Sequence, residues 1–168
     1  MWENLGVALE KVAKDRMKAK PPQDKLGFGL HFTDYMLLMQ WNRQDGWHDS
    51  KICPYQDFHL NPASMVFHYG QAIFEGLKAY RTPEGGINLF RPRLNFERIN
   101  MSNSRMVIPA IDPDFGVHAL KQLIRLEQDW TGSVKGNRSR ACQHGHVAAF
   151  QPFFRFAERT GRENPAVS

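Results

Sequence analysis

Cysteine is scarce in this chain of 168 residues, which contains two, Cys53 and Cys142. They lie far apart, and neither has a histidine or another cysteine at the spacing typical of zinc ligands. A disulfide framework and a structural zinc site are therefore disfavoured, because each needs several such residues at suitable spacing. We expect both thiols to be free and reduced.

Long apolar runs are also missing. No segment approaches the roughly eighteen consecutive apolar residues that a membrane-spanning helix needs. The N-terminal segment MWENLGVALEKVAKDR mixes acidic residues with apolar ones, whereas a signal peptide has a basic start followed by an apolar block. The sequence therefore predicts a soluble cytoplasmic protein without a membrane partner.

The chain has no Gly-rich phosphate loop and no catalytic histidine pattern. Gly85-Gly86 has the setting of a hairpin turn and precedes a strand-like segment, whereas a phosphate loop precedes a helix. The 7 histidines form no Ser-His-Asp arrangement and no set of metal ligands. The sequence therefore indicates neither a P-loop nor a metal centre.

The net charge of +5 is concentrated at one end of the chain. Residues 131–168 contain six basic and two acidic residues, a net charge of +4, which leaves +1 for residues 1–130. A compact basic patch would favour nucleic acid, but these basic residues are scattered through a segment with little apolar periodicity. We expect a solvated, poorly folded tail and no specific nucleic-acid partner.

The length of 168 residues and the hydrophobic fraction of 42% suit one domain with a modest core. Apolar density and turn residues predict extended segments at 32–41, 65–69, 77–81 and 87–91. Turns are expected at 44–46 and 83–86, where glycine follows polar residues.

Helices are predicted in three places. Leu5, Leu9, Val12 and Ala13 recur at helical spacing before Pro21. Residues 94–106 have the length of a helix and no strand alternation. A third helix should begin after Asp112, a suitable cap, and pack on the sheet through one apolar face; that face comprises Val117, Leu120, Leu123 and Ile124.

The most distinctive segment is residues 66–81, VFHYGQAIFEGLKAYR, with a Phe-Glu-Gly-x-Lys core. It resembles the branched-chain aminotransferases. Further matches lie at 32–36, 46–49, 89–92, 95–98 and 108–109, so the likeness covers residues 27–130. D-amino-acid aminotransferases and aminodeoxychorismate lyases share the core alone and stay open as alternatives, whereas the long segment 27–62 favours the branched-chain group.

The resemblance implies an α+β fold: the small N-terminal domain of fold-type IV enzymes, a mostly antiparallel sheet packed with helices, over residues 1–130. It also implies pyridoxal phosphate as cofactor. Members of this family transfer the amino group of leucine, isoleucine or valine to 2-oxoglutarate, and they are homodimers or larger assemblies.

The resemblance identifies four site residues. Arg98 matches the arginine that binds the cofactor's phosphate, and a guanidinium suits that task because its planar fork forms paired, charge-assisted hydrogen bonds. Tyr69, Phe74 and Gly76 match residues that line the substrate pocket, where aromatic walls suit an aliphatic side chain and glycine permits close approach. Glu75 could act as a general acid or base beside the cofactor if burial raised its pKa, but no sequence pattern shows such burial.

The family's Schiff-base lysine lies in a large domain beyond the matched region, so Lys78 is not its equivalent and we expect no catalytic residue in this chain. Lys135 does not resemble that lysine site either. The chain should therefore be inactive alone. Residues 131–168 resemble nothing in the family. An intact match followed by an unrelated tail is the pattern expected from a reading-frame change or a truncated gene, and this is our hypothesis for its origin. A non-catalytic binding or interaction fragment is the other hypothesis.

Overall fold

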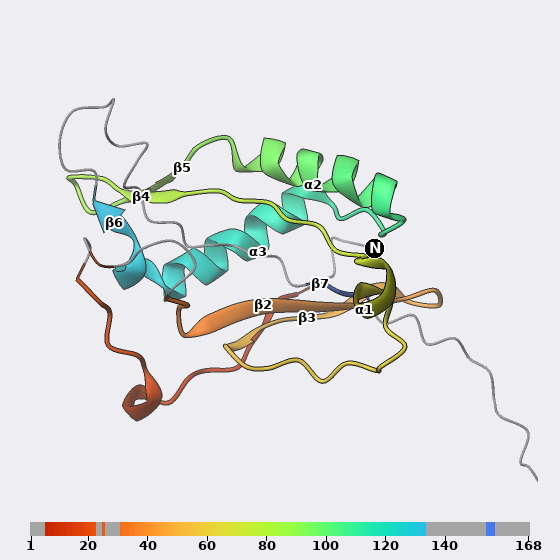
Figure 1. Cartoon of the computed structure of the whole chain (residues 1–168). Helices are drawn as coiled ribbons and strands as arrows, with labels where there is room; N and C mark the ends of the chain where they lie inside the picture. Colours follow the sequence, from red (N-terminus) through yellow and green to blue (C-terminus); the bar gives the residue numbers. More distant parts are fainter. Residues whose placement is uncertain (1–5, 23–24, 26–30, 134–153, 157–168) are drawn as a thin grey trace, which may run out of the picture.

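The computed structural model describes residues 6–22, 25, 31–133 and 154–156. Its largest elements are a β-hairpin and two helices: β2 (Tyr35–Asn42), β3 (Gly46–Pro54), α2 (Pro92–Met106) and α3 (Pro113–Leu126). In Figure 1, α3 runs between α2 and the hairpin. The described part of the chain is thus a small mixed structure of helices and two antiparallel strand pairs, to which shorter strands add in parallel.

The hairpin forms the centre of one sheet, whose strand order is β1-β3-β2-β7. β2 pairs antiparallel with β3 from Tyr35↔Pro54 to Asn42↔Gly46. The short outer strands β1 (Ala8–Leu9) and β7 (Phe154–Phe156) pair in parallel with β3 and β2. The register shifts between Leu38 and Gln40, opposite Asp49, whose φ of 48° is tolerated by aspartate in a bulge.

A second sheet has the order β5-β4-β6. β4 (Ala79–Arg81) and β5 (Ile87–Leu89) are antiparallel, and β6 (Gly132–Ser133) pairs in parallel with β4. The Thr82 amide donates to the Gly86 carbonyl at 2.8 Å, and Gly85 takes a φ of 87° that favours glycine. This turn confirms the one predicted at 83–86.

One hydrophobic core joins the hairpin, β4 and both long helices. Alternate residues of β2 point into it, as expected for a strand buried on one face. The face predicted for α3 is confirmed, because Leu120 and Ile124 are buried while Val117 and Leu123 pack against the core. The buried members are Tyr35, Leu37, Met39, Trp47, Ile52, Leu77, Ala79, Phe96, Ile99, Ile111, Phe115, Ala119, Leu120 and Ile124.

The predicted helices at 94–106 and after Asp112 are confirmed as α2 and α3. Both begin with proline. Proline suits a first helical turn because an N–H group there would have no acceptor within the helix, so the N–H that proline lacks is not needed. Asp112 caps α3, since its carboxylate accepts the Asp114 amide at 2.8 Å. The extended segments at 32–41, 77–81 and 87–91 are confirmed as β2, β4 and β5 with shifted ends.

Two predictions are wrong. Residues 6–22 contain β1 and the 3-10 turn η2 (Lys14–Arg16) where we expected a helix. There the Glu10 amide donates to the Ile52 carbonyl at 2.9 Å, so pairing with the hairpin outweighs the local helical pattern. Residues 65–69 form the short helix α1 (Met65–Tyr69), which Gly70 ends in left-handed backbone with a φ of 59°.

The short helix η4 (Gln128–Trp130) ends where the predicted domain boundary lies. Most of residues 131–168, including Cys142 and Lys135, lie outside the described residues. Cys53 is buried and free. None of the helices in the described part of the chain is long and apolar enough to span a membrane.

Candidate functional site

Arg98 projects from α2 toward Glu75, on the segment that leads into β4. Its Nε donates to Glu75 Oε2 at 2.7 Å, and its Nη2 donates to Glu75 Oε1. The carboxylate is buried, with 6% of its surface exposed, whereas the Arg98 side chain is 62% exposed. The guanidinium is thus held from beneath by a buried acid and is open to solvent on its outer side.

Glu75 is itself held by two further donors. The Gly76 amide and Asn95 Nδ2 each donate to Glu75 Oε1 at 3.0 Å. Asn95 Nδ2 also donates to the Gly76 carbonyl at 3.1 Å. Asn95 and Arg98 are three residues apart on α2 and therefore share a face, so this face of the helix is tied to the segment around Gly76.

Electrostatics keep Glu75 ionised. Burial acts to raise its pKa, but the hydrogen bonds from Arg98, Asn95 and the Gly76 amide, with the Arg98 charge, outweigh burial and lower the pKa below its ordinary value. The same pairing raises the pKa of Arg98. Glu75 is therefore a permanent anion near neutral pH, unsuited to general acid or base catalysis there.

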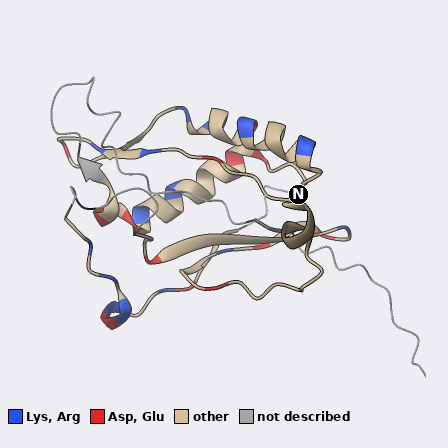
Figure 2. Cartoon of the chain, in the orientation of Figure 1, with Lys and Arg blue, Asp and Glu red and all other residues tan. Residues whose placement is uncertain are grey.

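Arg93, another basic residue of α2, has a different environment from Arg98. In Figure 2, the blue positions along α2 mark its arginines. Arg93 pairs with Glu97 at 3.5 Å and Asp114 at 3.4 Å, and all three side chains are well exposed. Exposed pairs of this kind contribute little to stability. Arg98 differs because its acidic partner is buried.

Phe74 and Gly76 lie beside this ion pair along the chain. The Phe74 side chain is exposed, and a Cβ placed on Gly76 would lie 3.7 Å from Phe74 Cζ. An apolar ring, a residue without a side chain and the Arg98–Glu75 pair therefore occupy one region. The structure brings together three of the four residues that the resemblance identified.

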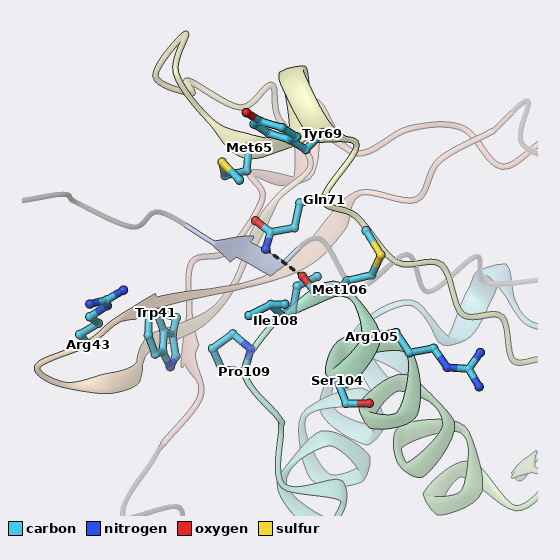
Figure 3. A pocket seen from close by; sticks show the side chains of 11 residues that line it. Trp41, Arg43, Met65, Tyr69, Gln71, Ser104, Arg105, Met106, Ile108 and Pro109 are labelled. Atoms are coloured by element: carbon cyan, nitrogen blue, oxygen red, sulfur yellow. Dashed lines mark hydrogen bonds between the residues drawn. The ribbon is translucent and has the colours of Figure 1, made fainter.

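Tyr69 lies elsewhere, at the end of α1, where it lines a hollow of about 780 Å³. Figure 3 shows Tyr69 and Met65 facing Ile108, Pro109 and Trp41 across this hollow. Arg98, Phe74 and Gly76 are not among its lining residues. The side-chain amide of Gln71 donates to the Met106 carbonyl at 2.9 Å and so joins the segment after α1 to the end of α2.

Sequence reasoning missed Glu75 and Asn95 as parts of the site. Both stand next to a residue or motif that it did identify, and the spacing of Asn95 and Arg98 could have indicated a shared helix face. The contact to Glu75 crosses 23 residues and leaves no local pattern. Among the described residues, no group of three or more His, Cys, Asp or Glu side chains could hold a metal ion.

Comparisons with known proteins give the relatives of this chain. No family model matches it. Branched-chain-amino-acid transaminase 1 of Bacillus subtilis (strain 168) is 51% identical over 119 residues, 71% of this chain and 33% of that protein. Branched-chain-amino-acid aminotransferase 2 of the same organism is 46% identical over the same shares of each chain.

A Staphylococcus epidermidis protein named "Probable branched-chain-amino-acid aminotransferase" is 48% identical over 123 residues, 73% of this chain and 34% of that protein. The chain thus spans about a third of the length of the curated relatives it matches. Over 71% to 73% of its own length, the chain is homologous to branched-chain-amino-acid aminotransferases, as its motifs predicted.

Proposed function

We propose that residues 1–130 are the small domain of a fold-type IV branched-chain-amino-acid aminotransferase, in which Arg98 binds the phosphate of pyridoxal phosphate. The observation that carries this proposal is the solvent-open guanidinium of Arg98, fixed by a buried carboxylate inside the region of homology. Leucine, isoleucine, valine and 2-oxo acids are the proposed substrates, and the cytoplasm is the proposed location.

The residues present fit a phosphate. Arginine has five N–H donors, and Glu75 accepts two of those of Arg98. A phosphate monoester could accept hydrogen bonds from the outer edge of the guanidinium, which stays protonated at any working pH. Phe74 and Gly76 would flank the bound group with an apolar face and open backbone. The proposed role of Tyr69 requires that the hollow beside α1 face the same ligand.

Pyridoxal phosphate supplies the electron sink that transamination needs. This chain's contribution is to bind and orient the cofactor. The lysine that holds the cofactor covalently belongs, by the resemblance, to the large domain, and the relatives extend well beyond the matched third. We therefore propose that the chain binds one side of the cofactor and has no turnover alone.

Replacing Arg98 by methionine tests the phosphate role. Arg98→Met keeps the apolar stem and removes the donors, so we expect pyridoxal phosphate to bind roughly 10-fold to 100-fold more weakly, the worth of charge-assisted hydrogen bonds. Binding to the full chain is measured by isothermal titration calorimetry. Mixtures of leucine, 2-oxoglutarate and cofactor should form no glutamate above a blank.

Arg93→Met is the matched control, because Arg93 lies on the same helix and its partners are exposed. It should leave cofactor binding nearly unchanged. Equal weakening by both variants would show that general positive charge attracts the cofactor and would contradict a specific role for Arg98. Glutamate formation by the chain alone would contradict its proposed inactivity.

A further inference from the structure

We propose that Glu75 is a positioning residue for Arg98: it fixes the guanidinium so that the remaining N–H donors form a site for a phosphate monoester. This inference rests on the proposed function of Arg98 and adds the residue through which that arginine acts. The supporting observations are the fork between the two side chains, the burial of Glu75 and the two other donors that hold it.

Orientation is costly for an arginine on a helix surface. Its long side chain has many rotamers, and much of this rotamer entropy must be lost before several donors can point at one ligand. Paired bonds from Nε and Nη2 to one carboxylate restrict the guanidinium plane. Because Glu75 is buried, with 6% of its surface exposed, the anchor itself has little freedom.

The Glu75 carboxylate accepts four hydrogen bonds from its neighbours. An ionised carboxylate has about four lone-pair sites, and Glu75 accepts from Arg98 Nε, Arg98 Nη2, Asn95 Nδ2 and the Gly76 amide. Three of these donors bond to Oε1 and one to Oε2, so the buried carboxylate is committed mainly to groups that fix its own position and that of Arg98. The arrangement therefore supports a holding role.

Charge balance explains why orientation matters here. A buried carboxylate without a cation would be strongly unfavourable, so Glu75 needs Arg98. The pair has no net charge, and an anion would gain little from its long-range field. Attraction of a phosphate then depends on the Arg98 N–H groups that point at it. Glu75 controls the direction of these groups because it fixes the plane of the guanidinium.

The test compares the full-length chain with Glu75→Gln. Glutamine keeps an oxygen in place of Oε1, for Asn95, the Gly76 amide and Arg98 Nη2, but places an N–H₂ group opposite Arg98 Nε and so breaks the paired hydrogen bonds. We expect the Arg98 Nε–H signal in ¹⁵N NMR, ordered in the wild type, to show fast side-chain motion in the variant. Affinity for pyridoxal phosphate should fall about 10-fold, the lower range for loss of a group that orients a ligand-binding residue, with little change in melting temperature.

Glu97→Gln is the matched control, since Glu97 lies on α2 and pairs with Arg93 instead. It should change neither the Arg98 signal nor cofactor affinity. Tighter binding by Glu75→Gln would show that Glu75 competes with phosphate for Arg98 and would overturn the proposal. An unchanged affinity and an unchanged Arg98 signal would also overturn it.

Failure of the two proposals can be told apart. If Arg98→Met weakens cofactor binding and Glu75→Gln does not, Arg98 binds phosphate without help and the positioning role is wrong. If Arg98→Met has no effect, the phosphate role itself is wrong. Should Glu75→Gln not fold, the wild-type Arg98 signal can be followed as pH falls; order must persist until Glu75 is protonated, and loss of order at neutral pH would refute the role.

Discussion

Two buried glutamates show how the environment of a single residue decides its chemistry. Glu75 faces an arginine, and its pKa is lowered. Glu127 has 4% of its surface exposed, and burial raises its pKa to about 7 although the Tyr35 amide and the Thr33 hydroxyl donate to it. The nearby charge of Asp34 raises the pKa further. The same residue type is thus a fixed anion at one site and titrates near neutral pH at the other.

The raised pKa of Glu127 should make the free energy of unfolding depend on pH. Its folded-state pKa of about 7 lies above the ordinary value of 4.5 for a glutamate, so the folded state binds the proton more tightly than the unfolded state. This contribution is fully present below about pH 4.5 and is lost as pH rises through about 7, with a total of roughly 3 kcal/mol at most. Glu127→Gln should remove this pH-dependent loss of stability, because glutamine does not ionise. The variant should therefore be more stable than the wild type above neutral pH.

Urea unfolding at a series of pH values measures this difference. Glutamine keeps an acceptor for the Tyr35 amide, which donates to Glu127 at 2.6 Å in the wild type. The exposed Glu97→Gln serves as control and should follow the wild-type curve. Parallel curves for the wild type and Glu127→Gln between pH 5 and 8 would contradict a raised pKa at this position.

At the scale of elements, the close approach of α2 and α3 depends on Gly116. Gly116 is buried on α3 and faces the ring of Phe96 on α2. A Cβ at this position would lie 2.8 Å from Phe96 Cζ and closer still to two other ring atoms. Phe96 is 1% exposed and part of the core, so its ring cannot turn away without disturbing the packing.

Gly116→Ala should therefore destabilise the protein. Alanine favours a helix over glycine by about 1 kcal/mol, but overpacking a core typically costs about 1–3 kcal/mol, and we expect the overpacking to prevail. Thermal unfolding measures the net effect. Gly6→Ala is the control, since no atom lies within 4 Å of a Cβ there. A stabilised Gly116→Ala protein would show that the two helices can separate at little cost.

At the scale of the whole molecule, several large apolar side chains remain exposed to solvent. Six of them, on α1, on α2 or next to these helices, are 60% to 79% exposed: Phe67, Tyr69, Phe74, Phe90, Met101 and Val107. Exposed apolar side chains of this size are removed from unfavourable contact with water when another protein part covers them. The relatives are about three times as long as the matched region, which agrees with a surface that other parts of such a protein could cover.

We expect the isolated chain to self-associate through some of these exposed apolar side chains. Replacing Phe67 and Phe90 by serine removes two exposed rings outside the core, so we expect the double variant to be more monomeric than the wild type at the same concentration. Sedimentation velocity over a concentration series measures the difference. Lys121→Ser, an exposed polar change on α3, is the control. Equal association of all three proteins would argue against an apolar contact.

The sequence alone predicted the structures that depend on neighbouring residues. The turn at Gly46, the Thr82–Gly86 turn and the cap at Asp112 were readable because each requires a particular residue type within a few positions. The motif around residues 66–81 also predicted the homology that the relatives confirm. The roles of Arg98, Tyr69, Phe74 and Gly76 stay predictions.

Only the tertiary structure decided the contacts between distant residues. Residues 8–9 form a strand because β3 offers free edge groups, although their own spacing is helical. Glu75 meets Arg98 across 23 residues, and Glu127 meets the Tyr35 amide across 92. Sequence periodicity reports backbone conformation and the buried face of an element. It does not report which buried charge receives a partner, because that depends on how the elements pack.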